Sequence, residues 1–169
     1  VPKTIRILGE DLIVFRDKSG RFGLFHPFCC HRGAALENGI VSERGLRCCY
    51  HGWLFDVDGT VLETPGEPPG SKLKENVFQG AYPAVEIKGL VHAYMGPPEL
   101  QPHPPHYDLF DVPGAKFAPF STPFPNNWLQ SHENNVDPVH TVFLHGRITE
   151  HFGAPFAVLP HIVWDLSHN

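Results

Sequence analysis

Two short segments of this chain each carry a thiol and an imidazole a few residues apart, and they constrain its fold more than any other feature. The first segment runs Cys29-Cys30-His31-Arg32-Gly33, and the second runs Cys48-Cys49-Tyr50-His51-Gly52-Trp53. Sixteen residues, Arg32 to Arg47, separate His31 from Cys48, and all four cysteines of the chain lie within the two segments. Two sulfur and two nitrogen donors are enough for one compact metal centre. The fold is therefore expected to bring the two segments together.

The spacing of these donors favours one kind of centre over another. Zinc sites with two cysteines and two histidines typically pair like ligands, as a Cys-Cys half followed by a His-His half. Here each loop provides one ligand of each kind, Cys29 with His31 and Cys48 with His51. That mixture favours a [2Fe–2S] cluster in which the two cysteines bind one iron and the two histidines bind the other. A zinc site is the alternative.

Composition and charge exclude several other classes of protein. The net charge is −5 and no lysine or arginine cluster is present, which argues against a nucleic-acid surface. No run of about 18 apolar residues indicates a membrane span, and no signal peptide is visible. Four cysteines in metal-binding spacing indicate a reducing cytoplasm. The first and last residues run into predicted strands, so the chain is expected to be a fragment of a longer protein.

Alternating apolar residues and turn signals predict a small all-β domain over residues 1–96. Asp17 to Gly20, Asp58-Gly59 and Lys88-Gly89 mark three of its hairpin turns. The two metal-binding loops are expected at one tip of this domain. Its predicted strands cover residues 4–8, 11–16, 21–28, 46–50, 53–57, 60–63, 84–87 and 90–95.

A proline-rich segment and a second group of metal-binding residues follow. Residues 97–125 hold nine of the eighteen prolines, which predicts an extended linker. In residues 126–169, Asp137 and His140 are three positions apart and share a face if the chain is helical there. His145 lies five positions after His140, so it has to curve back past the end of a regular helix. Two histidines with an orienting carboxylate favour a mononuclear Fe(II) site.

The first group of motifs resembles the cluster loops of Rieske ring-hydroxylating oxygenases. The resemblance rests on Cys29-x-His31-Arg32-Gly33-Ala34 and on Cys48-x-Tyr50-His51-Gly52-Trp53-x-Phe55. The family usually has proline where this chain has Cys30 and Cys49. A register shift that makes these two residues the ligands is disfavoured, because Cys30 and His31 are adjacent and can hardly reach different irons. The two spare thiols are expected to be free and buried, with a disulfide between the loops as the alternative.

The second group resembles the start of the catalytic domain in the same family, closest to the branch of phthalate dioxygenase. Asn127-Trp128, Glu133-Asn134, Asp137, His140 and His145 match that pattern. The resemblance implies a mainly β Rieske domain followed by the beginning of an α+β, helix-grip-like domain. It also places a third, carboxylate ligand of the mononuclear iron beyond residue 169. Neither Glu150 nor Asp165 matches the position of that ligand.

The family resemblance implies an oxygenase subunit that hydroxylates an aromatic or related organic substrate with O2, as in aromatic hydrocarbon catabolism. Its electrons come from NADH through a reductase, in some systems with a ferredoxin. It also implies a homotrimer in which His31 or His51 faces Asp137 of a neighbouring subunit. The alternatives are an oxidative O- or N-demethylase of the same family and a Rieske ferredoxin, an electron carrier that has no need of residues 137–145.

Two further expectations concern residues around these sites. The three tryptophans, Trp53, Trp128 and Trp164, are expected to lie in the hydrophobic core. Gly33, Gly52 and Gly59 are expected to allow tight turns near the cluster.

Overall fold

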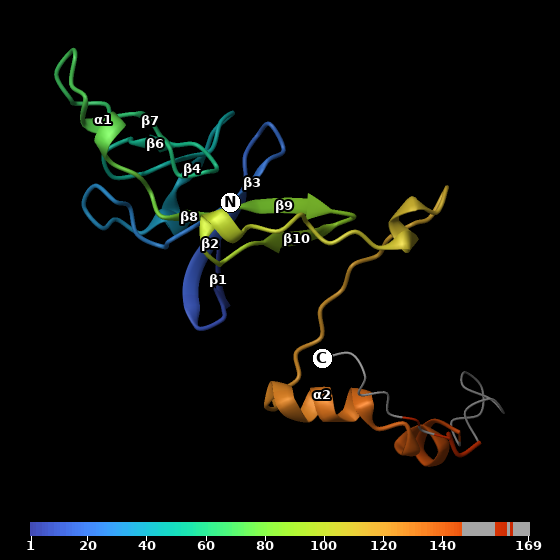
Figure 1. The fold of residues 1–169 in the computed structure, drawn as a ribbon. Coiled ribbons are helices and arrows are strands. Elements are labelled where there is room, and N and C mark those ends of the chain that lie inside the picture. The colour runs from blue at the N-terminus through green and yellow to red at the C-terminus, as the bar shows by residue number, and fades with distance from the viewer. Residues whose placement is uncertain (147–157, 162, 164–169) are drawn as a thin grey trace. The chain divides into compact units, whose positions relative to one another are not determined.

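A computed structural model describes residues 1–146, 158–161 and 163 of the chain. The chain divides into two compact units, Val1–Phe120 and Ser121–Asn169 (Figure 1). Among the described residues, no helix has both the length and the apolar character needed to span a membrane. Every strand pairing found in these residues is antiparallel, which confirms the predicted mainly β class.

Two four-stranded sheets and a separate hairpin make up the first unit. The first sheet has the order β1-β2-β3-β8, and the second has the order β4-β5-β6-β7. Strand bounds are β1 (Lys3–Ile7), β2 (Glu10–Arg16), β3 (Phe22–Phe25), β4 (Ile40–Val41), β5 (Leu46–Arg47), β6 (Leu54–Phe55), β7 (Val61–Glu63), β8 (Ala81–Tyr82), β9 (Ala84–Ile87) and β10 (Leu90–Ala93).

A single hydrophobic core joins the two sheets. Phe15 and Phe25 come from the first sheet, and their rings meet edge to face with centroids 4.8 Å apart. Phe25 also meets Phe55 of the second sheet edge to face, with centroids 6.3 Å apart. Such aromatic pairs contribute about 0.5–1.5 kcal/mol beyond the burial of their area. The same core contains Cys29 and Cys48, so the packing that joins the sheets also holds the two predicted cluster loops.

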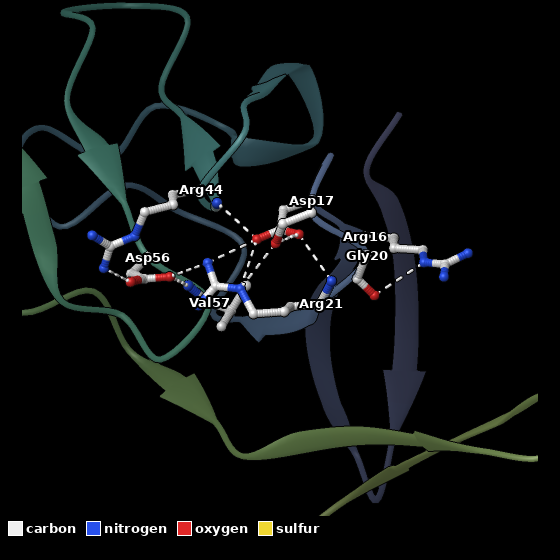
Figure 2. Close-up of polar contacts among 9 residues, drawn as sticks. Arg16, Asp17, Gly20, Arg21, Arg44, Asp56 and Val57 are labelled. Atoms are coloured by element: carbon white, nitrogen blue, oxygen red, sulfur yellow. Dashed lines mark hydrogen bonds and ion pairs between the residues drawn. The ribbon is translucent and has the colours of Figure 1, made fainter.

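A polar network crosses between the sheets beside this core (Figure 2). Asp17, in the β2–β3 turn, binds the Arg21 guanidinium at 2.9 Å and accepts a hydrogen bond from the Gly45 amide at 3.2 Å. Arg21 reaches on to Asp56, just after β6, at 2.7 Å, and Arg44 pairs with the other oxygen of Asp56. Both carboxylates are buried, and these partners compensate their charge. The network therefore fixes the β2–β3 turn against the sheet that carries the second loop.

The remaining elements are short helices and turns. Residues 97–127, all of them described, contain no strand and include two 3-10 turns, in keeping with their proline content. In the second unit the Asn127 side chain caps helix α2 by accepting a hydrogen bond from the Leu129 amide at 2.9 Å. The bounds are η1 (Leu36–Asn38), α1 (Leu73–Asn76), η2 (Pro98–Leu100), η3 (Asp108–Asp111), α2 (Trp128–Val136) and the π-helix η4 (Thr141–His145).

Candidate metal centre

The two predicted cluster loops close with the same hydrogen-bond pattern. In the first loop the Cys29 amide donates to the Ala34 carbonyl at 2.9 Å, and the Gly33 amide donates back to the Cys29 carbonyl at 2.8 Å. In the second loop the Cys48 amide donates to the Trp53 carbonyl at 2.8 Å, and the Gly52 amide donates to the Cys48 carbonyl at 3.1 Å.

A glycine four residues after the cysteine makes this closure possible in each loop. Gly33 and Gly52 have φ values of +68° and +72°, a conformation that favours glycine over residues with a Cβ atom. The expectation that these glycines allow tight turns is therefore confirmed. The matching closures also place Cys29 and Cys48 at equivalent positions of two similar loops.

The thiols of Cys29 and Cys48 are buried and adjacent. Burial is the main cause that raises the pKa of the Cys29 thiol to about 11, the Cys48 thiol adds to it, and the His31 backbone amide opposes it. A thiolate at this place needs a nearby cation, which a metal centre provides. All four cysteines are free, but Cys30 and Cys49 are exposed, so the expectation that the spare thiols are buried is wrong.

The imidazoles of His31 and His51 meet edge to face. Their ring centroids are 4.8 Å apart, and the planes meet at 66°. His31 Nδ1 is buried and has no hydrogen-bond partner among the described residues. Burial lowers the pKa of His31, and the charges of His51 and Arg32 add to the effect, so the neutral ring that a metal ligand requires is favoured. Two buried thiols and a ring nitrogen without a partner fit a [2Fe–2S] cluster.

Trp53 packs against the imidazole of His31. Its indole is 2% exposed, which confirms the predicted core position. It also stacks on His31, with ring centroids 4.3 Å apart and planes within 3° of parallel. The same expectation is wrong for Trp128, which is 74% exposed, and Trp164 lies outside the described residues.

Two residues that the sequence motifs do not mark hold the loops in place. Arg47 donates to the Gly52 carbonyl at 2.7 Å and pairs with Glu63 at 2.6 Å, which fixes the second loop against β7. Gln79 donates to two carbonyls of the first loop region and accepts from the Cys30 amide. Gln79 is 49 positions from Cys30, so no local pattern identifies it.

The second predicted site lies after helix α2. Asp137 Oδ1 accepts a hydrogen bond from the Val139 amide at 2.9 Å and so begins the next helical turn. Its other oxygen, Oδ2, lies 3.4 Å from His140 Nδ1. The chain then forms the π-helix η4, closed by the Gly146 amide on the Thr141 carbonyl at 2.8 Å. The wider turn brings His140 and His145 to one side, with ring centroids 5.5 Å apart.

No group of three or more His, Cys, Asp or Glu side chains in the described part of the chain is arranged to bind a single metal ion. A [2Fe–2S] cluster of the mixed-ligand kind needs only two protein ligands on each iron. Cys29 with Cys48, and His31 with His51, would form such pairs. Glu150 and Asp165, the acids after His145, lie outside the described residues.

Known proteins resemble this chain over most of its length. Residues 1–86 match the family described as Rieske [2Fe-2S] domain. The oxygenase subunit of tert-butanol monooxygenase/tert-amyl alcohol desaturase from Aquincola tertiaricarbonis is 59% identical over 88% of this chain and 32% of its own length. Phenoxybenzoate dioxygenase subunit alpha from Ectopseudomonas oleovorans is 46% identical over 95% of this chain and 43% of its own length.

A solved structure gives the same result for the fold. The crystal structure of dicamba monooxygenase bound to dicamba superposes with a TM-score of 0.56 at 27% identity, over 66% of this chain and 36% of that one. The chain spans only 32% and 43% of the lengths of the two curated relatives. The match over residues 1–86, just over half of the chain, shows that the chain belongs to the Rieske [2Fe-2S] domain family.

Proposed function

We propose that this chain is part of the oxygenase component of a Rieske non-haem iron oxygenase that hydroxylates an aromatic or related organic substrate with O2. The observation that carries the proposal is the presence of two different donor groups in one chain. Twin loops hold two buried thiols and two imidazoles in edge-to-face contact, and the segment after α2 holds His140, His145 and Asp137. A ferredoxin that only carries electrons has no use for the second group.

The described residues suit the two proposed cofactors in different ways. Cys29 and Cys48 would hold one iron of a [2Fe–2S] cluster and His31 and His51 the other, while His140 and His145 would hold a mononuclear Fe(II). When bound, the cluster supplies one-electron transfer and the Fe(II) supplies a site for O2. The relatives named as oxygenase subunits support both assignments.

The protein's own groups prepare these sites. Trp53 holds the plane of the His31 ring, and the loop closures hold the Cys29 and Cys48 backbones. Asp137 caps the turn that carries His140 with one oxygen, and its other oxygen lies 3.4 Å from His140 Nδ1. Both cluster imidazoles are only partly buried, so a partner surface can approach them.

We also infer partners and a location from this assignment. A reductase, with or without a ferredoxin, delivers electrons from NADH in the cytoplasm, where the free cysteines stay reduced. The protein assembles as a homotrimer in which His31 or His51 of one subunit approaches Asp137 of the next. Small organic molecules like those in the relatives' names, a phenoxybenzoate or a tertiary alcohol, are the first substrates to test.

Metal analysis of the full protein, purified without oxygen, tests the proposal. About three irons and about two acid-labile sulfides per chain are expected, with a brown-red visible spectrum and an EPR signal after reduction. A colourless protein that contains zinc would overturn the assignment. With a reductase and NADH, O2 consumption should depend on one of the candidate substrates.

Variants separate the two metals and the two cysteine registers. Cys48→Ser should abolish the visible spectrum, whereas the exposed neighbour Cys49→Ser should leave it unchanged. His140→Ala should remove about one iron per chain and keep the visible spectrum. Loss of the spectrum in Cys49→Ser but not in Cys48→Ser would reverse the ligand register, and loss of both metals in His140→Ala would argue against two separate sites.

A further inference from the structure

Gln79 is a buried polar residue whose side chain forms hydrogen bonds with the backbone of the first cluster loop and the residues just before it. It is 1% exposed and lies between helix α1 and strand β8. Its Oε1 accepts a hydrogen bond from the Cys30 amide at 2.8 Å. Its Nε2 donates to the His26 carbonyl at 3.2 Å and to the Phe28 carbonyl at 3.1 Å. Three contacts therefore hold the backbone that leads into Cys29 and His31.

The main chain of Gln79 is fixed to the other half of the site. Its amide donates to the Gly59 carbonyl at 3.0 Å, and its neighbour Phe78 forms a bridge with Thr60. Gly59 and Thr60 belong to the β6–β7 hairpin, which begins directly after the second cluster loop. One residue thus connects the hairpin behind Cys48 and His51 to the loop that carries Cys29 and His31.

The chemistry of these contacts requires a carboxamide of this length. The two carbonyls need two N–H donors, and the Cys30 amide needs an acceptor. The carboxamide of a glutamine supplies both donors and the acceptor. A glutamate offers the acceptor but sets a carboxylate against two carbonyl oxygens. An asparagine is one methylene shorter, and an apolar side chain removes the Gln79 partner from all three backbone groups.

We propose that Gln79 is a positioning residue of the cluster site. Its carboxamide fixes the backbone on both sides of Cys29 and thereby sets where Cys29 and His31 stand relative to Cys48 and His51. The proposal rests on the proposed function in one respect, namely that these four side chains hold the [2Fe–2S] cluster.

Gln79→Met and Gln79→Glu test the proposal in the full protein. Gln79→Met removes all three contacts, so exchange of the Cys30 amide hydrogen should accelerate about tenfold in the cluster-free protein. In the cluster-loaded protein the reduction potential and the EPR g-values should shift from those of the wild type. Gln79→Glu keeps the contact with Cys30, so its amide exchange should stay closer to that of the wild type while its potential still shifts.

Leu12→Ala is the matched control for a loss of stability alone. Leu12 is fully buried in β2 but lies outside the group of core residues that includes Cys29 and Cys48. This variant should lower the melting temperature without moving the potential or the g-values. If Leu12→Ala moves them as much as Gln79→Met does, the role of Gln79 is merely structural.

Two failures can be told apart. A wild-type protein without a cluster signal overturns the proposed function itself. If the wild-type protein shows the cluster signal and the Gln79 variants have the same potential and g-values as the wild type, only the positioning role is overturned. If Gln79→Met does not fold, the volume-matched Gln79→Glu decides by the same measurements.

Discussion

The indole of Trp53 lies flat against the imidazole of His31, with ring centroids 4.3 Å apart and planes 3° from parallel. Trp53 is the last residue of the second loop, whereas His31 belongs to the first. The stack therefore joins the two loops through side chains, in addition to the shared core. Because the indole is buried and cannot rotate freely, it restricts the plane in which the His31 ring can lie.

Replacing Trp53 should alter the cluster more than it alters the fold. In Trp53→Leu the flat surface under His31 is lost, so the ring is less restricted and the EPR g-values of the reduced cluster should broaden and shift. Trp53→Phe keeps a flat ring and should fall between Trp53→Leu and the wild type. The stability loss should stay below the roughly 3–5 kcal/mol that removal of a buried aromatic side chain to alanine costs.

Phe15→Leu is the control for this comparison. Phe15 is as buried as Trp53, but its ring packs on Phe25 rather than on a histidine. It should lower the free energy of unfolding by a similar amount and leave the g-values unchanged. Equal spectral changes in both variants would show that general loosening of the core, not the stack, determines the signal.

The sequence predicted the hairpins well because turn residues mark them. The turns at residues 17–20, 58–59 and 88–89 all join antiparallel neighbours, as expected. The predicted strand over residues 21–28 is shorter in the structure, where β3 ends at Phe25. The residues after Phe25 leave the sheet because their hydrogen bonds close the first loop or contact Gln79. Two-residue strands such as β4 and β8 are too short for any alternating pattern to predict.

In the candidate sites, too, local sequence patterns predicted some features and missed others. Motif spacing predicted which thiols and imidazoles come together in the loops. It did not predict Gln79, because contacts over about fifty positions leave no local pattern. Nor did helical periodicity predict how His145 reaches His140. A spacing of five does not match a regular α-helix, but it matches the wider turn of the π-helix η4.

Asp137→Asn should separate the two roles of Asp137. Asparagine keeps the side-chain oxygen that accepts from the Val139 amide, so the helical turn should persist. It removes the charge 3.4 Å from His140 Nδ1. We expect both metals to remain bound while the single-turnover rate of electron transfer to the substrate site falls sharply. Asp137→Ala should in addition lose about 1 kcal/mol of stability with the cap. A wild-type rate in Asp137→Asn would refute the electrostatic role.

Acid should lower the free energy of unfolding, because it protonates the two carboxylates of the Asp17–Arg21–Asp56 network. Burial alone would raise the pKa of Asp17, but hydrogen bonds from Ser19, Arg21 and Gly45 outweigh it and lower the pKa. The pKa of Asp56 is lowered in the same way, against its burial, by Arg44, the Val57 amide and Arg21. Unfolded aspartate has a pKa of about 3.9, so the unfolded chain takes up these protons first as the pH falls. The contribution is complete above about pH 5 and is lost as the pH falls through the lowered pKa values.

Asp17→Asn measures that contribution. It should lower the free energy of unfolding by about 1–3 kcal/mol at pH 7 and reduce the further loss between about pH 5 and about pH 2, both measured by urea denaturation. Asp11→Asn is the matched control, because the Asp11–Arg6 pair is exposed and worth about 0–1 kcal/mol. Equal acid sensitivity in wild type and Asp17→Asn would exclude Asp17 as a source of the pH dependence.

Gly59→Ala should damage the cluster site from a distance. Gly59 has φ +90°, and a Cβ atom there would lie 2.1 Å from the Gln79 carbonyl oxygen and 2.7 Å from the Phe78 ring. Relief of that overlap has to move the segment that holds the first loop, at a cost of about 1–3 kcal/mol beyond the backbone strain. Gly9→Ala is the control, since its φ is +89° and no atom lies within 4 Å of the added Cβ. Both variants therefore bear similar backbone strain, and only Gly59→Ala should also lose visible cluster absorbance per folded chain. Equal absorbance in the two variants would show that the contact between Gly59 and Gln79 does not affect how the loops hold the cluster.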